Sequence, residues 1–253
     1  MYIRIPKYLT LIFALLFAIP LSKALNGQEI DHWETIIETG QNVKYLVPES
    51  PVPVDWDNPG FDDTGWTDGI AGIGYGDDDD NTIDTCISVY VRYRFTITDT
   101  TVIERLLLDM DFDDGFVAYL NGEEIARENM GEAFSSTTWD QLSDGIVSEQ
   151  PEGSYRYIMT NDHVNSLLIG ENIFCVEVHN QSESSSDLSS NAYLHAGINT
   201  SASYFSSPPS WFRPPADPIN FDSYLPVMLI NTNGQRIEDD PRIVADMGLI
   251  YNG

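Results

Sequence analysis

The pattern of hydrophobic and polar residues predicts an all-β protein. From Trp33 onward, short runs rich in β-branched and aromatic residues are separated by clusters of Gly, Asp, Asn and Pro. Short runs with a period of two are typical of strands that bury one face. The clearest predicted strands cover residues 88–97, 103–112, 116–120, 172–180 and 192–200.

Local signals add one short helix and one hairpin. In "NDHVNSLLIG", Asn161 or Asp162 can act as the N-cap and Gly170 lies just past the end. Asn121-Gly122 stands between two predicted strands. Because Asn-Gly supplies the positive φ angles of a type I′ turn, this pair predicts a β-hairpin.

The N-terminal residues predict export. Arg4 and Lys7 precede an apolar run, residues 9–21, that is short for a membrane span, and Ser22-Lys23-Ala24 follows with small residues before a cleavage site. We predict a signal peptide at residues 1–24 and a secreted protein, extracellular or on the cell surface. A membrane anchor is the alternative.

The C-terminal part predicts a linker followed by an incomplete domain. Five prolines within residues 204–221 fix φ and remove backbone donors, which favours an extended linker after a main domain at residues 25–203. Residues 222–253 contain an apolar strand, 225–230, and an Asn-Gly turn at Asn233-Gly234. Since about thirty residues cannot bury a core alone, we expect a truncated second domain.

Charge and motifs exclude several functions. The chain has 12 Lys and Arg against 40 Asp and Glu, a formal net charge of -28. A phosphate-binding face needs clustered cations, so nucleic acid is excluded as a partner, and membrane contact is expected only through the export signal. The sequence has no G-x-S-x-G elbow, P-loop or dinucleotide fingerprint, which favours a non-catalytic chain.

An acidic row has two interpretations. Asp109, Asp111 and Asp113 are spaced by two and would project from one face of a strand. If the flanking strands pair, Arg92 and Arg94 would lie opposite this row and balance its charge. A calcium site is the rival interpretation, although the EF-hand spacing is not met.

The acids after this row most simply form a turn. In Asp113-Asp114-Gly115, the aspartates can accept hydrogen bonds from backbone amides, as Asx motifs do.

A second acidic segment is the better candidate for a metal. In "GYGDDDDNT", glycines flank Asp77, Asp78, Asp79 and Asp80, and such a loop can fold several carboxylates around Ca²⁺. A solvated, unstructured loop is the alternative. Structural Ca²⁺ is the only cofactor that the sequence suggests.

The two cysteines allow a disulfide. An exported pair such as Cys86 and Cys175 can be bonded, but the sequence does not show that the two positions meet. Two free thiols are the alternative.

Aromatic and polar residues suggest a saccharide-binding surface. Aromatic faces with nearby Asp, Asn and Arg suit sugar rings, and Glu177 and His179 share one face of the strand at 172–180. The alternative is that the aromatic residues belong to the core and that His179 is structural. The candidate ligand-binding residues are Trp66, Tyr75, Arg92, Arg94, Glu177 and His179.

Four ordered blocks carry a resemblance: "FDDTGWTDGIAGIGYGD", "VYVRYRF", "DFDDGFVAYLNGEEIARENM" and "LIGENIFCVEVHNQSESSSDLS". Over roughly residues 33–203 the chain resembles the galactose-binding-domain-like β-sandwich modules of large exported bacterial proteins. The resemblance implies an antiparallel jelly roll, usually non-catalytic, sometimes binding carbohydrate and often holding one structural calcium. It also implies that Asp113, Asp114, Gly115, Asn121 and Gly122 define the family's hairpin. Cys175 departs from the small residue expected there.

The tail "LPVMLINTNGQRIEDDPRIVADMGLIYNG" resembles the opening of a CotH-type region, related to the spore-coat protein kinases. The family's catalytic residues would lie beyond Gly253. Three hypotheses follow: an accessory module that binds a polysaccharide or cell-surface glycan or supports the downstream domain of the same polypeptide, the N-terminal piece of a CotH-type enzyme, and a structural or adhesive spacer.

Overall fold

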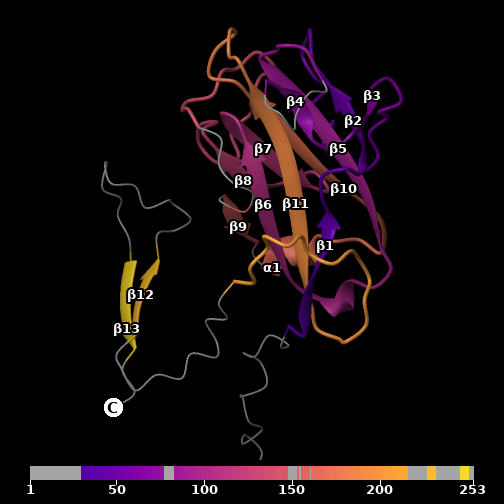
Figure 1. Cartoon of the computed structure of the whole chain (residues 1–253), viewed down its shortest axis with the longest axis vertical. Coiled ribbons are helices and arrows are strands. Elements are labelled where there is room, and N and C mark those ends of the chain that lie inside the picture. The colour runs from indigo at the N-terminus through magenta and orange to yellow at the C-terminus, as the bar shows by residue number, and fades with distance from the viewer. Residues whose placement is uncertain are drawn as a thin grey trace, which may run out of the picture. The chain divides into compact units, whose positions relative to one another are not determined.

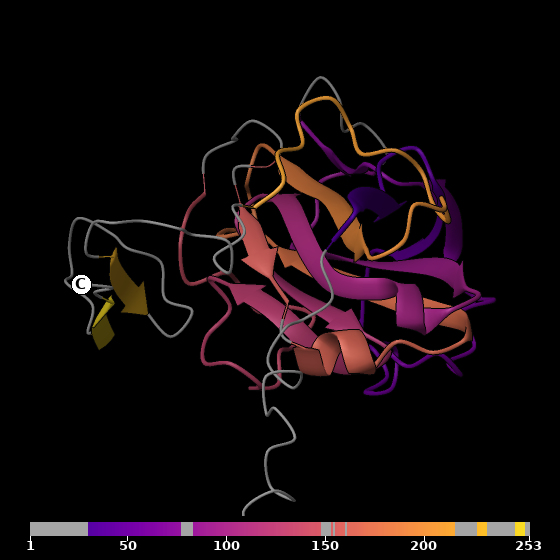
Figure 2. The ribbon, with the colours of Figure 1, turned by 90° about the horizontal axis from the view of Figure 1, so that it is seen from below.

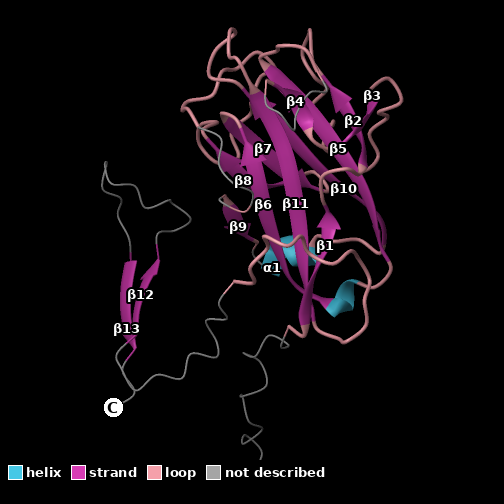
Figure 3. Cartoon of the chain, viewed as in Figure 1, coloured by secondary structure: helices cyan, strands magenta, loops and turns pink. Residues whose placement is uncertain are grey.

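The structure, a computed structural model, describes residues 30–76, 83–147, 153, 155–159, 161–215, 227–231 and 246–250. These residues form mostly antiparallel strands, with one short helix, α1 (Asn161–Asn165), and a 3₁₀ turn at Thr100–Val102 (Figure 3). The signal peptide predicted at residues 1–24 and the acidic loop with Asp77, Asp78, Asp79 and Asp80 lie outside the described residues. Both stay predictions.

The chain divides into two compact units, Met1–Phe212 and Arg213–Gly253. The first unit contains two sheets packed face to face (Figures 1 and 2). Sheet A has the order β1-β11-β6-β9, with β4 also paired to β11, and consists of β1 (His32–Ile37), β4 (Ile73–Tyr75), β6 (Ile103–Phe112), β9 (Arg156–Ile158) and β11 (Leu188–Ile198). Sheet B has the order β3-β2-β5-β10-β7-β8 and consists of β2 (Asn42–Leu46), β3 (Thr67–Ile70), β5 (Ser88–Ile97), β7 (Gly115–Leu120), β8 (Glu123–Glu128) and β10 (Gly170–His179).

The predicted fold class is confirmed: the first unit is an antiparallel β-sandwich. Its chain crosses between the sheets from β5 to β6, from β9 to β10 and from β10 to β11, as in a jelly roll. Strands β5 and β6 have the predicted bounds, while β7, β10 and β11 differ from the prediction only at their ends. The predicted helix is present at Asn161–Asn165, so Asn161 is its first residue rather than a cap outside it, and Gly170, with a φ of 103°, opens β10 instead of following the helix directly.

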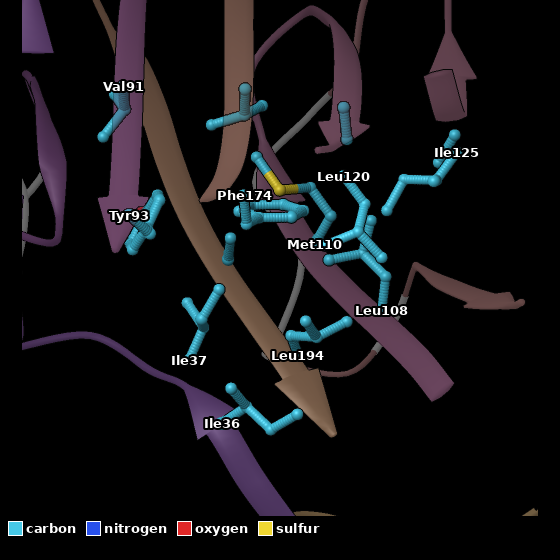
Figure 4. Packing of buried hydrophobic residues seen from close by; sticks show 14 of the residues in the cluster. Ile36, Ile37, Val91, Tyr93, Leu108, Met110, Leu120, Ile125, Phe174 and Leu194 are labelled. Atoms are coloured by element: carbon cyan, nitrogen blue, oxygen red, sulfur yellow. The ribbon is translucent and has the colours of Figure 1, made fainter. Parts of the chain in front are cut away.

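The core lies between the two sheets and follows the period of two. In β5, for example, Val89, Val91 and Tyr93 enter the core, while the residues between them project from the other face of sheet B. Figure 4 shows part of this packing, with side chains from both sheets: Ile36, Ile37, Leu108, Met110 and Leu194 from sheet A, and Val91, Tyr93, Leu120, Ile125 and Phe174 from sheet B. Burial of such side chains from water is the main driving force for folding.

The predicted hairpin joins β7 and β8. Asn121 and Gly122 have φ angles of 52° and 89°, the positive values that a type I′ turn needs. The Asn121 side chain accepts the Ile173 N–H at 2.9 Å and donates to the Ser166 carbonyl at 3.0 Å, which ties the turn to β10. A Cβ atom at residue 122 would lie 2.4 Å from Asn58 Oδ1, the end of a side chain that can move away, so the positive φ is the main reason for glycine here.

The turn before β7 is held by longer-range bonds than an Asx motif makes. Asp114 Oδ1 accepts the Val147 N–H and Oδ2 accepts the Gln181 N–H, both at 2.9 Å. A Cβ atom on Gly115 would lie 2.8 Å from Ser143 Cβ, so glycine allows close packing here. Asp113 and Asp114 are both buried, and the Asp114 carboxylate braces two loops from outside the hairpin.

Residues 204–212 form a strap on the sandwich. Glu34 Oε2 accepts the backbone N–H groups of Tyr204 and Phe205, both at 2.9 Å. Thr35 and Ser206 form an antiparallel bridge through paired backbone bonds of 2.8 and 3.2 Å. The first part of the predicted linker therefore belongs to the sandwich unit, because its backbone groups are bonded to β1.

In the second unit, the described residues form a two-stranded antiparallel sheet, β12 (Val227–Asn231) with β13 (Asp246–Ile250). Residues 227–230 of the strand predicted at 225–230 thus lie in β12, and residues 225 and 226 lie outside the described residues. The turn predicted at Asn233-Gly234 lies outside the described residues, and the CotH-like nature of this segment stays a prediction.

Candidate functional site

A pocket of about 730 Å³ lies on the outer face of sheet B. Its floor comes from three neighbouring strands, with Tyr90 on β5, Glu177 on β10 and Tyr119 on β7. Two loops supply its walls: residues 51–57 on one side and residues 134–140 on the other. The volume lies within the range of about 300–1,000 Å³ found for small-molecule sites.

Strand register explains why these side chains meet. Tyr90 lies opposite Glu177 across the β5–β10 pair, and Tyr119 lies opposite Cys175 across the β10–β7 pair. Alternate residues of each strand face the core, so the residues between them gather on the outer face. The two loops then line the pocket on this face beside Glu177.

An aromatic cluster forms one side of the pocket. The Trp56 ring meets the rings of Tyr90 and Tyr119 edge to face, with centroid distances of 4.8 and 5.5 Å. Trp66 stacks on Trp56 at 6.0 Å from the far side. These geometries are the preferred ones for aromatic pairs, and they fix the orientation of the Trp56 ring.

Glu177 is the central polar group and is almost fully buried. Its Oε1 accepts the hydroxyls of Tyr119 and Thr137 at 2.8 and 2.7 Å, and its Oε2 lies 3.2 Å from His179 Nε2. Burial alone would raise the pKa of Glu177, but the hydrogen bonds from His179, Thr137 and Tyr119 outweigh it and lower this pKa. Glu177 is therefore an anion.

Two tyrosines and one histidine surround Glu177. Burial, and then the charge of Glu177, raise the pKa of both Tyr90 and Tyr119, so both phenols stay protonated and can donate. His179 Nδ1 lies 2.9 Å from the Gln141 carbonyl oxygen, while Nε2 faces Glu177. Both contacts of the His179 ring are therefore with acceptor oxygens.

Two exposed hydrophobic side chains stand at the rim, Val54 at 98% and Phe134 at 78% exposure. Phe134 has a φ of 61°, a conformation that is unusual for a bulky residue. Its N–H contacts both oxygens of Glu124 at 3.2 and 3.1 Å, and Arg127 in turn holds Glu124. A backbone outlier fixed by its surroundings often marks a functional site.

Arg92 anchors the loop that forms one wall. Its side chain is fully buried and donates to Asp63 Oδ2 at 2.9 Å, and also to the carbonyl oxygens of Trp56 and Asn58. Arg94, which is partly exposed, reaches the same Asp63 oxygen at 2.7 Å. Burial alone would raise the pKa of Asp63, but the bonds from Arg92 and Arg94 outweigh it and lower this pKa.

The predicted pairing of Arg92 and Arg94 with the acidic row is therefore wrong. Strands β5 and β6 belong to different sheets, and Asp109 lies on the outer face of sheet A. Its partners there are Arg156, which donates from Nε and Nη2 at 2.7 Å, and His195, whose Nε2 is 3.3 Å away. Burial would raise the pKa of Asp109, but these contacts outweigh it and lower this pKa.

Of the six predicted ligand-binding residues, Glu177 lines the pocket, and His179 contacts Glu177 but does not line the pocket itself. Trp66 and Arg92 lie buried in the layer beside it, and Arg94 lies further along β5. Tyr75 is elsewhere: it belongs to sheet A, and its hydroxyl accepts a bond from Asn180 at 2.8 Å. Five residues that line the pocket were not among the candidates predicted from the sequence: Asp57, Tyr90, Tyr119, Phe134 and Trp139.

Cys86 and Cys175 are not bonded to each other, so the predicted disulfide is absent. The reason is that they lie on different sides of sheet B. Cys175 points to the outer face, 3.6 Å from Arg92 Nη1, whereas Cys86 packs against the core between the sheets. Burial raises the pKa of Cys86 to about 11 and also raises the pKa of Cys175.

The described part of the chain contains neither a cluster of metal ligands nor a membrane-spanning helix. There, no group of three or more His, Cys, Asp or Glu side chains is arranged to hold a metal ion. No helix among the same residues is long and apolar enough to cross a bilayer. The proposed calcium loop lies outside those residues.

Comparison with known proteins gives distant structural similarities. No protein-family model matches the sequence, and no curated protein matches it. A β-glucuronidase from glycoside hydrolase family 2 aligns at 14% identity with a TM-score of 0.43, over 65% of this chain and 18% of that one. A β-glucuronidase from an uncultured Clostridium sp. aligns at 14% identity with a TM-score of 0.43, over 90% of this chain and 41% of that one. A β-glycosidase from Bacteroides vulgatus aligns at 14% identity with a TM-score of 0.38, over 64% of this chain and 20% of that one. This chain thus spans less than half the length of each.

Proposed function

We propose that this chain is an exported, non-catalytic accessory module that binds a saccharide in the pocket on the outer face of sheet B. In this proposal, the sandwich holds a polysaccharide or cell-surface glycan near the downstream part of the same polypeptide. The single observation that carries it is the combination of a pocket of about 730 Å³ with an aromatic wall and an exposed aromatic ring at its rim.

The pocket offers what a sugar requires. Sugar rings present apolar C–H faces that pack on aromatic rings, and hydroxyls that need donors and acceptors. The loop at residues 134–140 lines the pocket with Ser135, Ser136, Thr137 and Thr138, and Asp140 adds an acceptor. The exposed ring of Phe134 stands beside these polar groups.

The contacts of Glu177 favour a structural role over a catalytic role for this residue. A glycosidase needs one carboxyl group to act as the acid and a second to act as nucleophile or base. Glu177 is nearly fully buried and already engaged by Tyr119, Thr137 and His179, so its oxygens serve the architecture of the floor. Tyr90 and Tyr119 are neutral and suited to hydrogen bonding.

A glycan array with the purified protein, followed by isothermal titration calorimetry with each retained saccharide, tests the proposal. Phe134→Gly should weaken binding about fivefold or more, because it removes the exposed ring. The same change should leave the melting temperature equal or higher, since a positive φ costs an L-residue about 1–2 kcal/mol and costs glycine almost nothing.

Ile169→Ala is the matched control, because Ile169 is 74% exposed and lies outside the pocket lining. This variant should bind as the parent does. The proposal fails if no saccharide is retained, or if Phe134→Gly and Ile169→Ala have the same affinity as the parent.

A further inference from the structure

We propose that the pocket selects saccharides that carry a free, protonated amine over neutral and acidic saccharides. This inference rests on the proposed saccharide binding and names the chemical class of ligand within it. It follows from the charges that line the pocket, from how few of them are neutralised, and from the aromatic rings among them.

The charged side chains that line the pocket are all acidic. They are Asp57, Glu124, Asp140 and Glu177, and the described residues of the lining include no Lys, Arg or His. A carboxylate ligand such as a uronic acid would meet only like charges here, which is unfavourable in a partly enclosed site. An ammonium group would meet only opposite charges.

Two of the four acids already have side-chain partners. Glu124 is held by Arg127 through two bonds of 3.1 and 2.9 Å, and Glu177 contacts Tyr119, Thr137 and, at 3.2 Å, His179 Nε2. Asp57 and Asp140 are different, because none of the ion pairs formed among the described residues includes either of them. The pocket therefore has a net negative charge.

Asp57 is the key group because it combines this charge with burial. It is only 9% exposed, and its Oδ1 accepts one bond from Asn58 at 3.3 Å. Burial raises the pKa of Asp57; its own backbone hydrogen bond and the charge of Arg92 offset this only in part, and the charge of Glu177 adds to it, so a nearby positive charge would stabilise the Asp57 anion. A ligand ammonium beside Asp57 would supply the missing positive charge.

The aromatic residues favour the same ligand. Cations bind over aromatic rings, most strongly over Trp, and aromatic cages with nearby acids are a known solution for ammonium groups. Trp56, Tyr90, Tyr119 and Trp139 line the pocket with Asp57 and Asp140. One sugar can therefore place its ring on the aromatic wall and its amine on the acids.

The test compares three disaccharides by isothermal titration calorimetry: one of glucosamine, its N-acetylated form and one of glucuronic acid. Disaccharides are used because a chain of net charge -28 attracts polycations at any site. At about pH 6, where amines are protonated, and with about 0.15 M salt to screen distant charges, the glucosamine disaccharide should bind at least about tenfold more tightly than the N-acetylated one. The glucuronic acid disaccharide should bind most weakly.

Asp57→Asn should reduce the preference for the amine to less than about threefold and leave binding of the N-acetylated disaccharide within about twofold of the parent. The control is Glu183→Gln, which removes an exposed acid outside the pocket and should keep the full preference. Equal affinities for the amine and its N-acetylated form, or a full preference in Asp57→Asn, would overturn this inference and leave the saccharide proposal in place. Absence of binding by all three disaccharides and by every saccharide of the array would overturn both.

Discussion

Replacing Asp63 by alanine should destabilise the protein by about 3 kcal/mol and loosen the wall of the pocket. The Arg92 side chain is fully buried, and Asp63 is its only carboxylate partner among the described residues. Removing one member of a buried ion pair costs about 3–5 kcal/mol, because the other charge is left uncompensated. Arg92 would keep its bonds to the carbonyl oxygens of Trp56 and Asn58, so we expect a loss of stability at the lower end of this range.

Urea unfolding followed by tryptophan fluorescence measures this loss, since Trp56 and Trp66 lie in the loop that Arg92 holds. For a domain of this size, about 3 kcal/mol corresponds to a fall in melting temperature of about 6–12 °C. The control is Glu171→Ala, which removes the exposed partner of Arg94. Exposed pairs contribute less than about 1 kcal/mol, so this variant should melt close to the parent. Equal losses in the two variants would refute the buried-anchor argument.

Four further outcomes are expected. The first concerns pH, because the folded state lowers the pKa values of Asp63, Asp109 and Glu177. The stability that these carboxylates contribute is complete above their unfolded pKa of about 4 and is lost as the pH falls through their folded pKa values. The urea midpoint, measured at pH 7, 5, 4 and 3, should therefore decrease below about pH 4, and a constant midpoint would contradict this. Gly122→Ala and Gly40→Ala should each destabilise the protein by about 1 kcal/mol in urea unfolding, because both glycines have a positive φ and the atom nearest to a Cβ at residue 122 belongs to the movable end of Asn58. Unchanged midpoints in both variants would contradict this expectation. A thiol-reactive dye should titrate two thiols in urea and react slowly with the native protein, because Cys175 is buried and the pKa of Cys86 is about 11; a missing thiol in urea would indicate a disulfide. If the predicted calcium loop binds its ion, EDTA should lower the melting temperature and added Ca²⁺ should restore it, whereas an unchanged temperature would remove calcium from the description.

The strands could be predicted because their signals are local. Alternation over residues 88–97 and 103–112 gave the bounds of β5 and β6, and Asn121-Gly122 gave the hairpin. Sheet membership is different, because it depends on which strands pair across the sandwich. Strands β5 and β6 follow each other in sequence but lie in different sheets, which is why Arg92 pairs with Asp63 instead of Asp109.

The candidate site could be predicted only in part for a related reason. Glu177 and His179 lie on a strand, where their shared face follows from spacing. Phe134 and Trp139 lie in an irregular loop with no periodicity, and the position of that loop over β10 depends on tertiary contacts such as the bond from Thr137 to Glu177. Asp57 was one of 40 acids, and only its burial distinguishes it.

The strap has a mechanical consequence for a tethered module. The start of the sandwich and its end meet at one edge strand: Asp31 bonds to Ile198 just before β1, and Ser206 bonds to Thr35 within it. Tension applied through residues on either side of the sandwich would therefore load β1 and the strap, on sheet A. The pocket is on the outer face of sheet B, away from that line of force. Tension on the chain would therefore leave the residues of the pocket unloaded.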